Sequence, residues 1–299
     1  MSFIITADVS VRLLRDAVLP PLSSKVLKYL VETRCANIKS VVDVKKPFKP
    51  LQISMLLKGG RPLYRSGDVK GEVINLRAGT CLKGRISFAG SYEGCDPLNE
   101  FQGLIGIIES PYGEFQIDVL SIEFRKLESL SLGLTKFFKI EFVTPAVLTA
   151  KHMVPPTLKD KSRRLPERHR LLPQPSFIFS YLLKLWNSIA EPDERIPGPG
   201  AGDWEAYKLG RLADVTLVEV DYRLRPETVI VGRDSKGRLR RIRGFTGWVV
   251  YECLSRRLLP IYDKLLALAT YLGVGRSRGI GLGMVRVTGL SSNRLGISK

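Results

Sequence analysis

Apolar and polar residues follow two different periods in the first half of the chain. Extended or alternating segments, which predict strands, are Phe3–Leu14, Leu51–Leu57, Thr80–Phe88 and Glu114–Phe124. Helical spacing of apolar side chains follows Pro20-Pro21 in Leu22–Arg34, and Pro97–Ile108 is expected to form a second, short helix. The predicted order of elements in this half is therefore β-α-β-β-α-β.

The second half repeats this order in pattern, although not in residue identity. Predicted strands are Phe137–Thr144, Asp214–Arg223, the hairpin arms Thr228–Arg233 and Arg238–Tyr251, and Met284–Leu290. Helices are predicted at Phe177–Ile189 and Pro260–Leu272. Two stretches rich in proline with basic residues or glycine are predicted to be linkers or loops: Lys151–Pro175 and Glu191–Gly202.

Two such units in series predict an α+β protein with two tandem ferredoxin-like modules. We place the N-terminal module at residues 1–135 and the C-terminal module, which contains a glycine-rich loop at 273–283, at residues 136–299. The sheets of two such modules offer broad surfaces, and we expect a basic cleft between them.

The charge of the chain adds a prediction about the class of molecule that the protein binds. The net charge is +18, from 47 Lys and Arg against 29 Asp and Glu. A surplus of this size favours a polyanion, because each cation beside a phosphate releases condensed counterions. Nucleic acid is the leading partner, and an anionic membrane or a basic surface without a partner are the alternatives.

Cysteines and histidines give little support to a metal site. The four cysteines form no C-x-x-C pair, and only His152 and His169 could complete a site, so we expect no metal ion and no cofactor. The first residues lack the order of a signal peptide, and no apolar run is long enough to span a bilayer. We expect a cytoplasmic, reduced protein without a membrane partner, and its few Gln and Asn residues hint at a thermophilic source.

A glycine-rich segment between the last predicted helix and strand is the most specific motif. It reads Gly273-Val-Gly-Arg-Ser-Arg-Gly-Ile-Gly-Leu-Gly283. Such a loop brings backbone N–H groups close to phosphate oxygens because no side chain intervenes. The RNA-binding candidates here are Gly275, Arg276, Ser277, Arg278 and Gly279. The segment matches neither the dinucleotide-binding fingerprint nor the P-loop motif. A helix cap would explain only Gly273.

A basic stretch precedes the segment Gly244–Tyr251. Its RNA-binding candidates are Arg238, Arg240 and Arg241, and Arg243 follows them. Alternation places Arg241 and Arg243 on one face of a strand, pointing together at a ligand or at solvent. A solvated basic hairpin is the alternative. Base stacking is open to Trp186 and Trp248, but both lie in apolar stretches, which favours core packing.

These motifs together resemble a known family. The run from Gly244-Phe-Thr-Gly247, through the helix at Pro260–Leu272, to the glycines of 273–283 is similar to the C-terminal signature of the CRISPR repeat-processing endoribonucleases of the RAMP superfamily. Weaker similarities lie at Lys46-Pro-Phe48, Ile53–Leu56, Leu76–Gly79 and Phe142–Pro145. The tandem ferredoxin-like fold is also that of the family.

The resemblance implies an endoribonuclease that binds CRISPR repeat RNA and cleaves precursor crRNA within each repeat, without a metal ion. In such enzymes a ribose 2′-OH attacks the adjacent phosphate and leaves a 2′,3′-cyclic phosphate and a 5′-OH. Many members use a His after the first helix, but the segment 35–47 contains none. The catalytic candidates are therefore Lys25, Lys28, Tyr29, Lys46 and Arg243, with Lys45 as a further RNA contact. The alternative for any single lysine is a solvated surface charge.

Two other functions stay open at this point. The missing His favours a non-catalytic RNA-binding RAMP subunit of a CRISPR interference complex, which would bind repeat RNA and leave it intact. An unrelated basic RNA-binding protein would show no preference for the repeat. Association with subunits of an interference complex and formation of a homodimer are likewise open.

Overall fold

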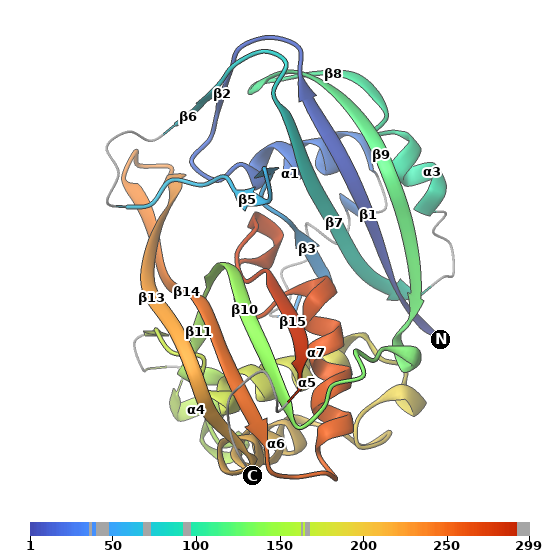
Figure 1. The fold of residues 1–299 in the computed structure, drawn as a ribbon, viewed down its shortest axis with the longest axis vertical. Coiled ribbons are helices and arrows are strands. Elements are labelled where there is room, and N and C mark those ends of the chain that lie inside the picture. Colours follow the sequence, from blue (N-terminus) through green and yellow to red (C-terminus); the bar gives the residue numbers. More distant parts are fainter. Residues whose placement is uncertain are drawn as a thin grey trace.

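The computed structural model describes residues 1–35, 38–39, 48–67, 73–91, 97–162, 164 and 168–291. Two antiparallel sheets form the framework, one in each half of the chain (Figure 1). The first sheet has the order β5-β4-β7-β1-β9-β8, with β3 also beside β7. Its strands are β1 (Ser2–Leu13), β3 (Leu51–Ile53), β4 (Leu57–Lys58), β5 (Arg61–Pro62), β7 (Cys81–Ser91), β8 (Gly106–Ser110) and β9 (Gly113–Lys126).

The alternation of β1 determines which face of the first sheet is covered. Ile5, Ala7, Val9 and Val11 are buried in one cluster with apolar residues of the helices α1 (Ser24–Arg34) and α3 (Pro97–Gln102). The polar residues between them, such as Asp8, lie on the opposite face, since successive side chains of a strand alternate. That uncovered face is turned towards the second half of the chain (Figure 1). A small separate sheet pairs β2 (Ala17–Leu19) with β6 (Ile74–Leu76).

The second sheet has the order β13-β14-β10-β15. Its strands are β10 (Phe137–Ala146), β13 (Leu217–Arg233), β14 (Leu239–Cys253) and β15 (Val285–Leu290), and its helices are α5 (Pro175–Ile189), α6 (Asp203–Thr216) and α7 (Leu259–Leu272). In each sheet the first strand of the unit lies between the third and the fourth. This shared order confirms the predicted tandem ferredoxin-like fold.

Several short elements connect these parts. They are α4 (Lys159–Ser162), the strand pair β11 (Leu148–Thr149) and β12 (His169–Arg170), and the 3₁₀ turns η1 (Leu127–Ser129), η2 (Ala150–Met153), η3 (Pro156–Leu158), η4 (Pro192–Glu194) and η5 (Arg278–Ile280). Among the described residues, no helix is long and apolar enough to cross a membrane.

Several predicted elements were wrong in part, and the strand predicted at Leu51–Leu57 is divided between β3 and β4. The strand predicted at Asp214–Arg223 begins only at Leu217, because residues up to Thr216 belong to α6, which the sequence did not predict. The β-branched residues at the end of α6 continue the alternation of β13 and hide the boundary. Glycine is needed at position 210 of α6, because a Cβ there would lie 2.9 Å from the Ser176 carbonyl oxygen of the neighbouring helix α5. The helix predicted at Pro97–Ile108 ends at Gln102, and Gly106 already starts β8.

The two halves are joined through backbone pairing as well as through the linker. The amide of Gly67 donates to the Thr228 carbonyl at 2.7 Å, and the amide of Ile230 donates to the Arg65 carbonyl at 3.1 Å. An edge segment of the first half therefore extends the second sheet beside β13. The sheets draw on residues 2–126 and 137–290, and the division at residue 135 stays a prediction.

The linker between the sheets is held by Asp263, a buried carboxylate of α7. It accepts hydrogen bonds from Ser131 Oγ at 2.5 Å and from the amides of Leu132 and Leu134 at 3.2 and 2.9 Å. We expect Asp263→Ala to lower the free energy of unfolding by about 2–3 kcal/mol, because three donors lose their partner. Urea denaturation measures this, with Asp263→Asn as a control that keeps one acceptor oxygen. A loss below about 0.5 kcal/mol would contradict the role.

Candidate nucleic-acid interface

The glycine-rich loop 273–283 is fixed by its own backbone. The amide of Val274 donates to the Gly283 carbonyl at 2.8 Å. The amide of Gly283 donates at 3.0 Å to the carbonyl of Pro145, which lies at the end of β10. A Cβ on Gly283 would lie 2.0 Å from the Val274 carbonyl oxygen, and its φ is +71°. Only glycine fits a backbone that approaches its neighbours so closely.

The loop rests on the first half of the chain at the start of α1. Ser24 donates its hydroxyl to the Ile280 carbonyl at 2.6 Å. At Gly281, where φ is +89°, a Cβ would lie 2.9 Å from Ser24 Cβ and 3.0 Å from the Met55 amide nitrogen. The contact therefore joins the two modules at the level of the backbone, and it brings α1 beside the loop.

Arg278 anchors the loop from inside, which corrects the expectation that its side chain reaches a phosphate. The side chain is only 4% exposed. Its guanidinium donates to the Leu272 carbonyl at 2.6 Å and to the Lys49 carbonyl, and it lies 5.6 Å from the centre of the Tyr181 ring. The two carbonyls and the ring thus contact the guanidinium from more than one side, so its charge points into the protein.

An open pocket of about 390 Å³ lies between the loop and the first module. We call it the basic pocket, and its walls are formed by Lys28, Lys49, Leu51, Tyr181 and Gly275–Ile280. Four of the lining side chains are cationic and none is a carboxylate. Gly279 leaves space at the wall, since a Cβ there would meet only Leu51, at 3.8 Å. The pocket joins Lys28 to every candidate of the loop: Gly275, Arg276, Ser277, Arg278 and Gly279.

Lys25 lies one turn before Lys28 on α1 and extends the positive charge towards the β13–β14 hairpin. Its Nζ lies 2.8 Å from the position that a Cβ of Gly232 would take. Burial, then the charge of Lys28, then that of Arg240 lower the pKa of Lys25 below its ordinary value. Lys28 itself forms an ion pair with Glu32 at 2.8 Å. Three sequence candidates from α1 and β14 thus lie close to one another.

The other candidate arginines of the β13–β14 hairpin are Arg238, Arg241 and Arg243. All three are exposed, and they lie at different places on the hairpin. Arg241 and Arg243 lie opposite Ile230 and Thr228 in the ladder, on the face of β14 opposite to Arg240, since side chains alternate. They therefore do not join Lys25. Arg238, at the turn, pairs with Asp234 at 3.0 Å.

The remaining candidates do not extend the basic pocket. Tyr29 packs edge-on against Tyr112, with ring centres 6.2 Å apart, on the core of the first module. This gives it a packing partner away from the loop. Lys45 and Lys46 lie outside the described residues.

Sequence reasoning missed Ser24, Lys49 and Tyr181. Tyr181 is a buried residue of α5, and burial raises its pKa, with Arg278 acting in the opposite direction. His152 packs on this same ring, at 5.1 Å between centres, and on Phe48 at 5.7 Å. No local signal marks Tyr181, because the sequence separates it widely from the loop.

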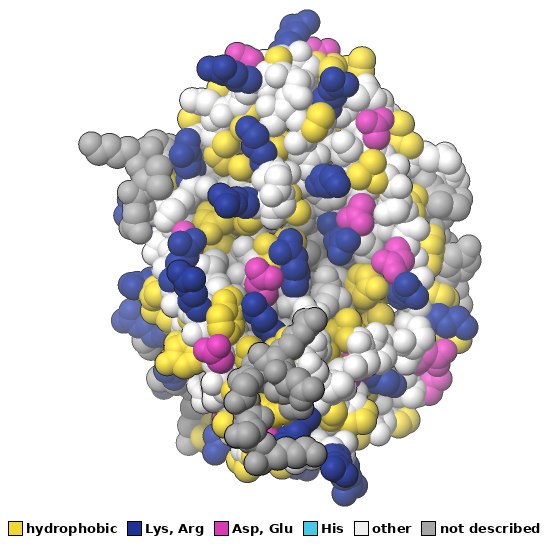
Figure 2. Space-filling model, in the orientation of Figure 1, with side chains coloured by type: hydrophobic (Ala, Val, Ile, Leu, Met, Phe, Trp, Pro, Cys, Tyr) yellow, Lys and Arg dark blue, Asp and Glu magenta, His cyan; other side chains and the backbone are white. Residues whose placement is uncertain are grey.

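Positive charge extends well beyond the pocket. Figure 2 shows Lys and Arg side chains across one face of the molecule, densest along its left margin, where Figure 1 places the β13–β14 hairpin. Asp and Glu are fewer on this face. Within the described ranges, no three His, Cys, Asp or Glu side chains are grouped so that they could hold a metal ion. The arrangement suits a phosphate backbone that runs across both modules.

Comparisons with known proteins agree with this geometry. The model of the Cas6 N-terminal domain matches residues 5–125, and that of the CRISPR-associated endoribonuclease Cas6 matches residues 140–285. Two Saccharolobus solfataricus proteins, CRISPR-associated endoribonucleases Cas6 1 and Cas6 2, are 29% and 31% identical over 281 residues, which is 92% of this chain and 92% of each relative. A solved Cas6 product complex has the same fold, with a TM-score of 0.62 and 19% identity over 96% of this chain and 100% of that one.

The two arginines of the loop are expected to respond differently to substitution. Arg278→Ala should lower the free energy of unfolding by about 3 kcal/mol, because two buried carbonyls lose a charged donor. Arg278→Lys should recover only part of this, since one ammonium cannot replace a planar fork. Arg276→Ala, at an exposed position, is the matched control and should change stability by less than about 0.5 kcal/mol. Equal losses in urea denaturation would contradict the assignment.

Proposed function

The chain belongs to the CRISPR-associated endoribonuclease Cas6 family, and from this premise we propose that it binds CRISPR repeat RNA and cleaves the precursor transcript within each repeat without a metal ion. The observation that carries this is the basic pocket, where α1, the segment before β3 and the glycine-rich loop bring together four cationic side chains, one of them the buried Arg278, in a lining without a carboxylate. Both modules are needed to form it, as expected for a site built by this tandem fold.

The pocket is suited to the crowded phosphate of the reaction. The 2′ oxygen forms a bond to phosphorus while the bond to the 5′ oxygen breaks, and negative charge gathers on the phosphoryl oxygens. Lys28 and the loop from Gly275 to Gly279 face this position, and fixed donors of this kind stabilise a transition state without reorganising. The products are a 2′,3′-cyclic phosphate and a 5′-OH.

Proton transfer falls to the two lysines of α1. The 2′-OH must lose a proton, and Lys25 is the better acceptor because its lowered pKa leaves more of it neutral than an ordinary lysine. The departing 5′ oxygen must gain a proton, and the ammonium of Lys28 supplies it. Arg240 neutralises the backbone beside Lys25. Two lysines with different surroundings thus replace the histidine that the sequence lacks after α1.

Labelled repeat RNA incubated with the protein in excess EDTA tests the proposal. We expect one cut per repeat and a product whose 3′ end resists phosphatase until the cyclic phosphate is opened by acid. A scrambled RNA of equal length is the control and should stay intact. Tight binding without any cut would instead identify a non-catalytic RNA-binding subunit, and a free 3′-OH would exclude 2′-OH attack.

Substitutions of Lys25 separate proton transfer from charge. In the wild type the cleavage rate should rise with pH, as more Lys25 becomes neutral, and level off above its lowered pKa. Lys25→Arg keeps the charge but cannot act as a base, so we expect a rate about a hundredfold or more lower, with RNA affinity retained. Lys25→Met should lose rate and affinity together. Single-turnover rates and filter binding measure both, and a Lys25→Arg variant with the wild-type pH profile would show that Lys25 acts through its charge alone.

A further inference from the structure

A second pocket lies on the other side of the glycine-rich loop, between the uncovered face of the first sheet and the end of α7. Its volume is about 440 Å³. Gly273 lines this pocket, whereas Gly275 lines the basic pocket, so one loop borders both. On β3 the same division holds, with Gln52 on this side and Leu51 on the other. The volume lies in the range of sites for small organic groups.

Gln52 is the unusual residue of this pocket. Its side chain is 3% exposed, yet neither Nε2 nor Oε1 has a hydrogen-bond partner among the described residues. A buried amide without partners is costly, about 1–3 kcal/mol, and such groups are rare in folded proteins. A methyl group on Gly273 would lie 1.9 Å from Oε1, so the glycine leaves the space that the amide fills. The fold thus leaves a buried donor and acceptor without partners in a residue that lines a cavity.

The polar neighbours of Gln52 are already paired. Ser87, opposite Gln52 in the ladder, accepts from Thr6 at 3.0 Å, and Ser54 accepts from the Arg85 amide at 2.7 Å. The guanidinium of Arg85 binds both carboxylate oxygens of Asp8, at 2.8 and 2.9 Å. None of these groups forms a hydrogen bond with the amide of Gln52, whose two polar atoms have no partner among the described residues.

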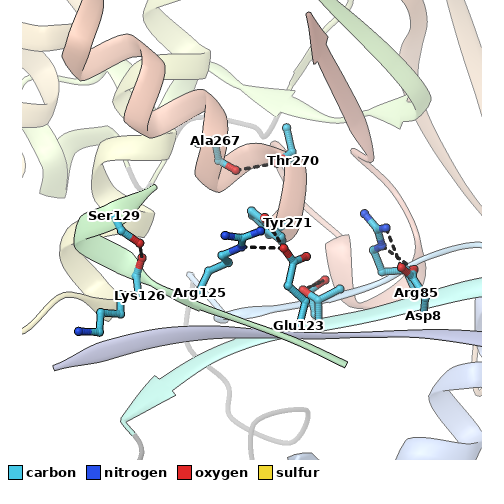
Figure 3. A network of polar contacts seen from close by, with 11 residues as sticks. Asp8, Arg85, Glu123, Arg125, Lys126, Ser129, Ala267, Thr270 and Tyr271 are labelled. Atoms are coloured by element: carbon cyan, nitrogen blue, oxygen red, sulfur yellow. Dashed lines mark hydrogen bonds and ion pairs between the residues drawn. The ribbon is translucent and has the colours of Figure 1, made fainter. Parts of the chain in front are cut away.

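The rim of the pocket combines an aromatic ring with positive charge. Tyr271, at the end of α7, lies above β9 near Glu123 and Arg125, beside the Asp8–Arg85 pair (Figure 3). Lys83 and Arg286 line the pocket and are exposed, Arg286 with Glu141 at 3.7 Å, and the one carboxylate in the lining, Asp8, is paired with Arg85. Cations at the mouth and an amide inside suit a ligand with an anionic end and a flat polar end.

We propose that this pocket holds one unpaired nucleotide of the bound RNA, with the base edge on the Gln52 amide and a phosphate towards Lys83 and Arg286. This rests on the proposed function and adds a residue that determines specificity. An amide offers one donor and one acceptor side by side, which matches a base edge that presents the same pair, as adenine does. An inorganic anion would leave the Nε2–Oε1 pair half unused, because its oxygens only accept.

A base-by-base scan tests the pairing between Gln52 and one nucleotide. Repeat RNAs with a single abasic nucleotide at each position in turn are bound to the wild type and to Gln52→Leu. For the wild type we expect one unpaired position where base removal raises Kd about tenfold. Gln52→Leu should raise Kd about as much for the intact RNA and show no further loss at that position, since the interaction is already gone.

The matched control is Gln116→Leu, the same change on β9, where the amide donates to Asp118 at 3.3 Å outside the pocket. It should leave Kd and cleavage unchanged. Gln52→Leu should also raise the melting temperature, because the unpaired amide is removed, which separates weaker binding from misfolding. Additive losses at every RNA position, or unchanged affinity of Gln52→Leu for the intact RNA, would overturn the proposal. The scan measures binding, so it remains decisive even if the wild type does not cut.

Discussion

The close backbone approach of the glycine-rich loop to both modules is the constraint on which the rest of the structure depends. At Gly281 a Cβ would collide with α1 and with the segment after β3, and at Gly275 it would come within 2.5 Å of the Val147 carbonyl of the second module. Without side chains at these points, the loop can fill the seam between two sheets that share no core strand. Residues from both halves are thereby held beside one loop, as the proposed stabilisation of a transient charge would require.

The electrostatics follow from this packing. The docked loop brings the charge of its own cations to that of α1, and burial of Arg278 by carbonyl partners holds one of those charges inside the wall. The pocket lining contains no carboxylate, and the ion pair of Lys28 with Glu32 lies beside it. Burial, and then the charges of Lys28 and Arg240, lower the pKa of Lys25, so in the proposed reaction the same crowding would attract a phosphate and prepare a proton acceptor. A bound phosphate would offset part of this repulsion, which couples binding to the protonation of the site.

The loop also separates two kinds of recognition. On the side of Leu51 the walls are cationic and suited to the sugar-phosphate backbone, which carries no sequence information. On the side of Gln52 the wall offers an amide, the kind of group that distinguishes bases. Because Gly273 on one side and Gly275 on the other belong to the same loop, a base held in one pocket and a phosphate in the other would be kept at a fixed separation.

Much of the fold was present in the sequence, because period 2 and period 3.6 are local properties: β1, α1 and α7 were predicted within a few residues. The glycine spacing and the basic stretch likewise indicated the loop and its partner class. The boundary of α6 was not readable, since its last residues also satisfy the alternation of β13, and helix packing against α5 decides the matter. Which cations act together was also decided by the tertiary structure. Strand alternation places Arg243 on the other face of β14 and carbonyl partners hold Arg278 inside the loop, whereas Lys25, Lys28 and Arg240 lie close to one another. The sequence determines which charged side chains the protein carries. The direction in which each side chain points, and how deeply it is buried, depend on contacts between residues that are distant in the chain.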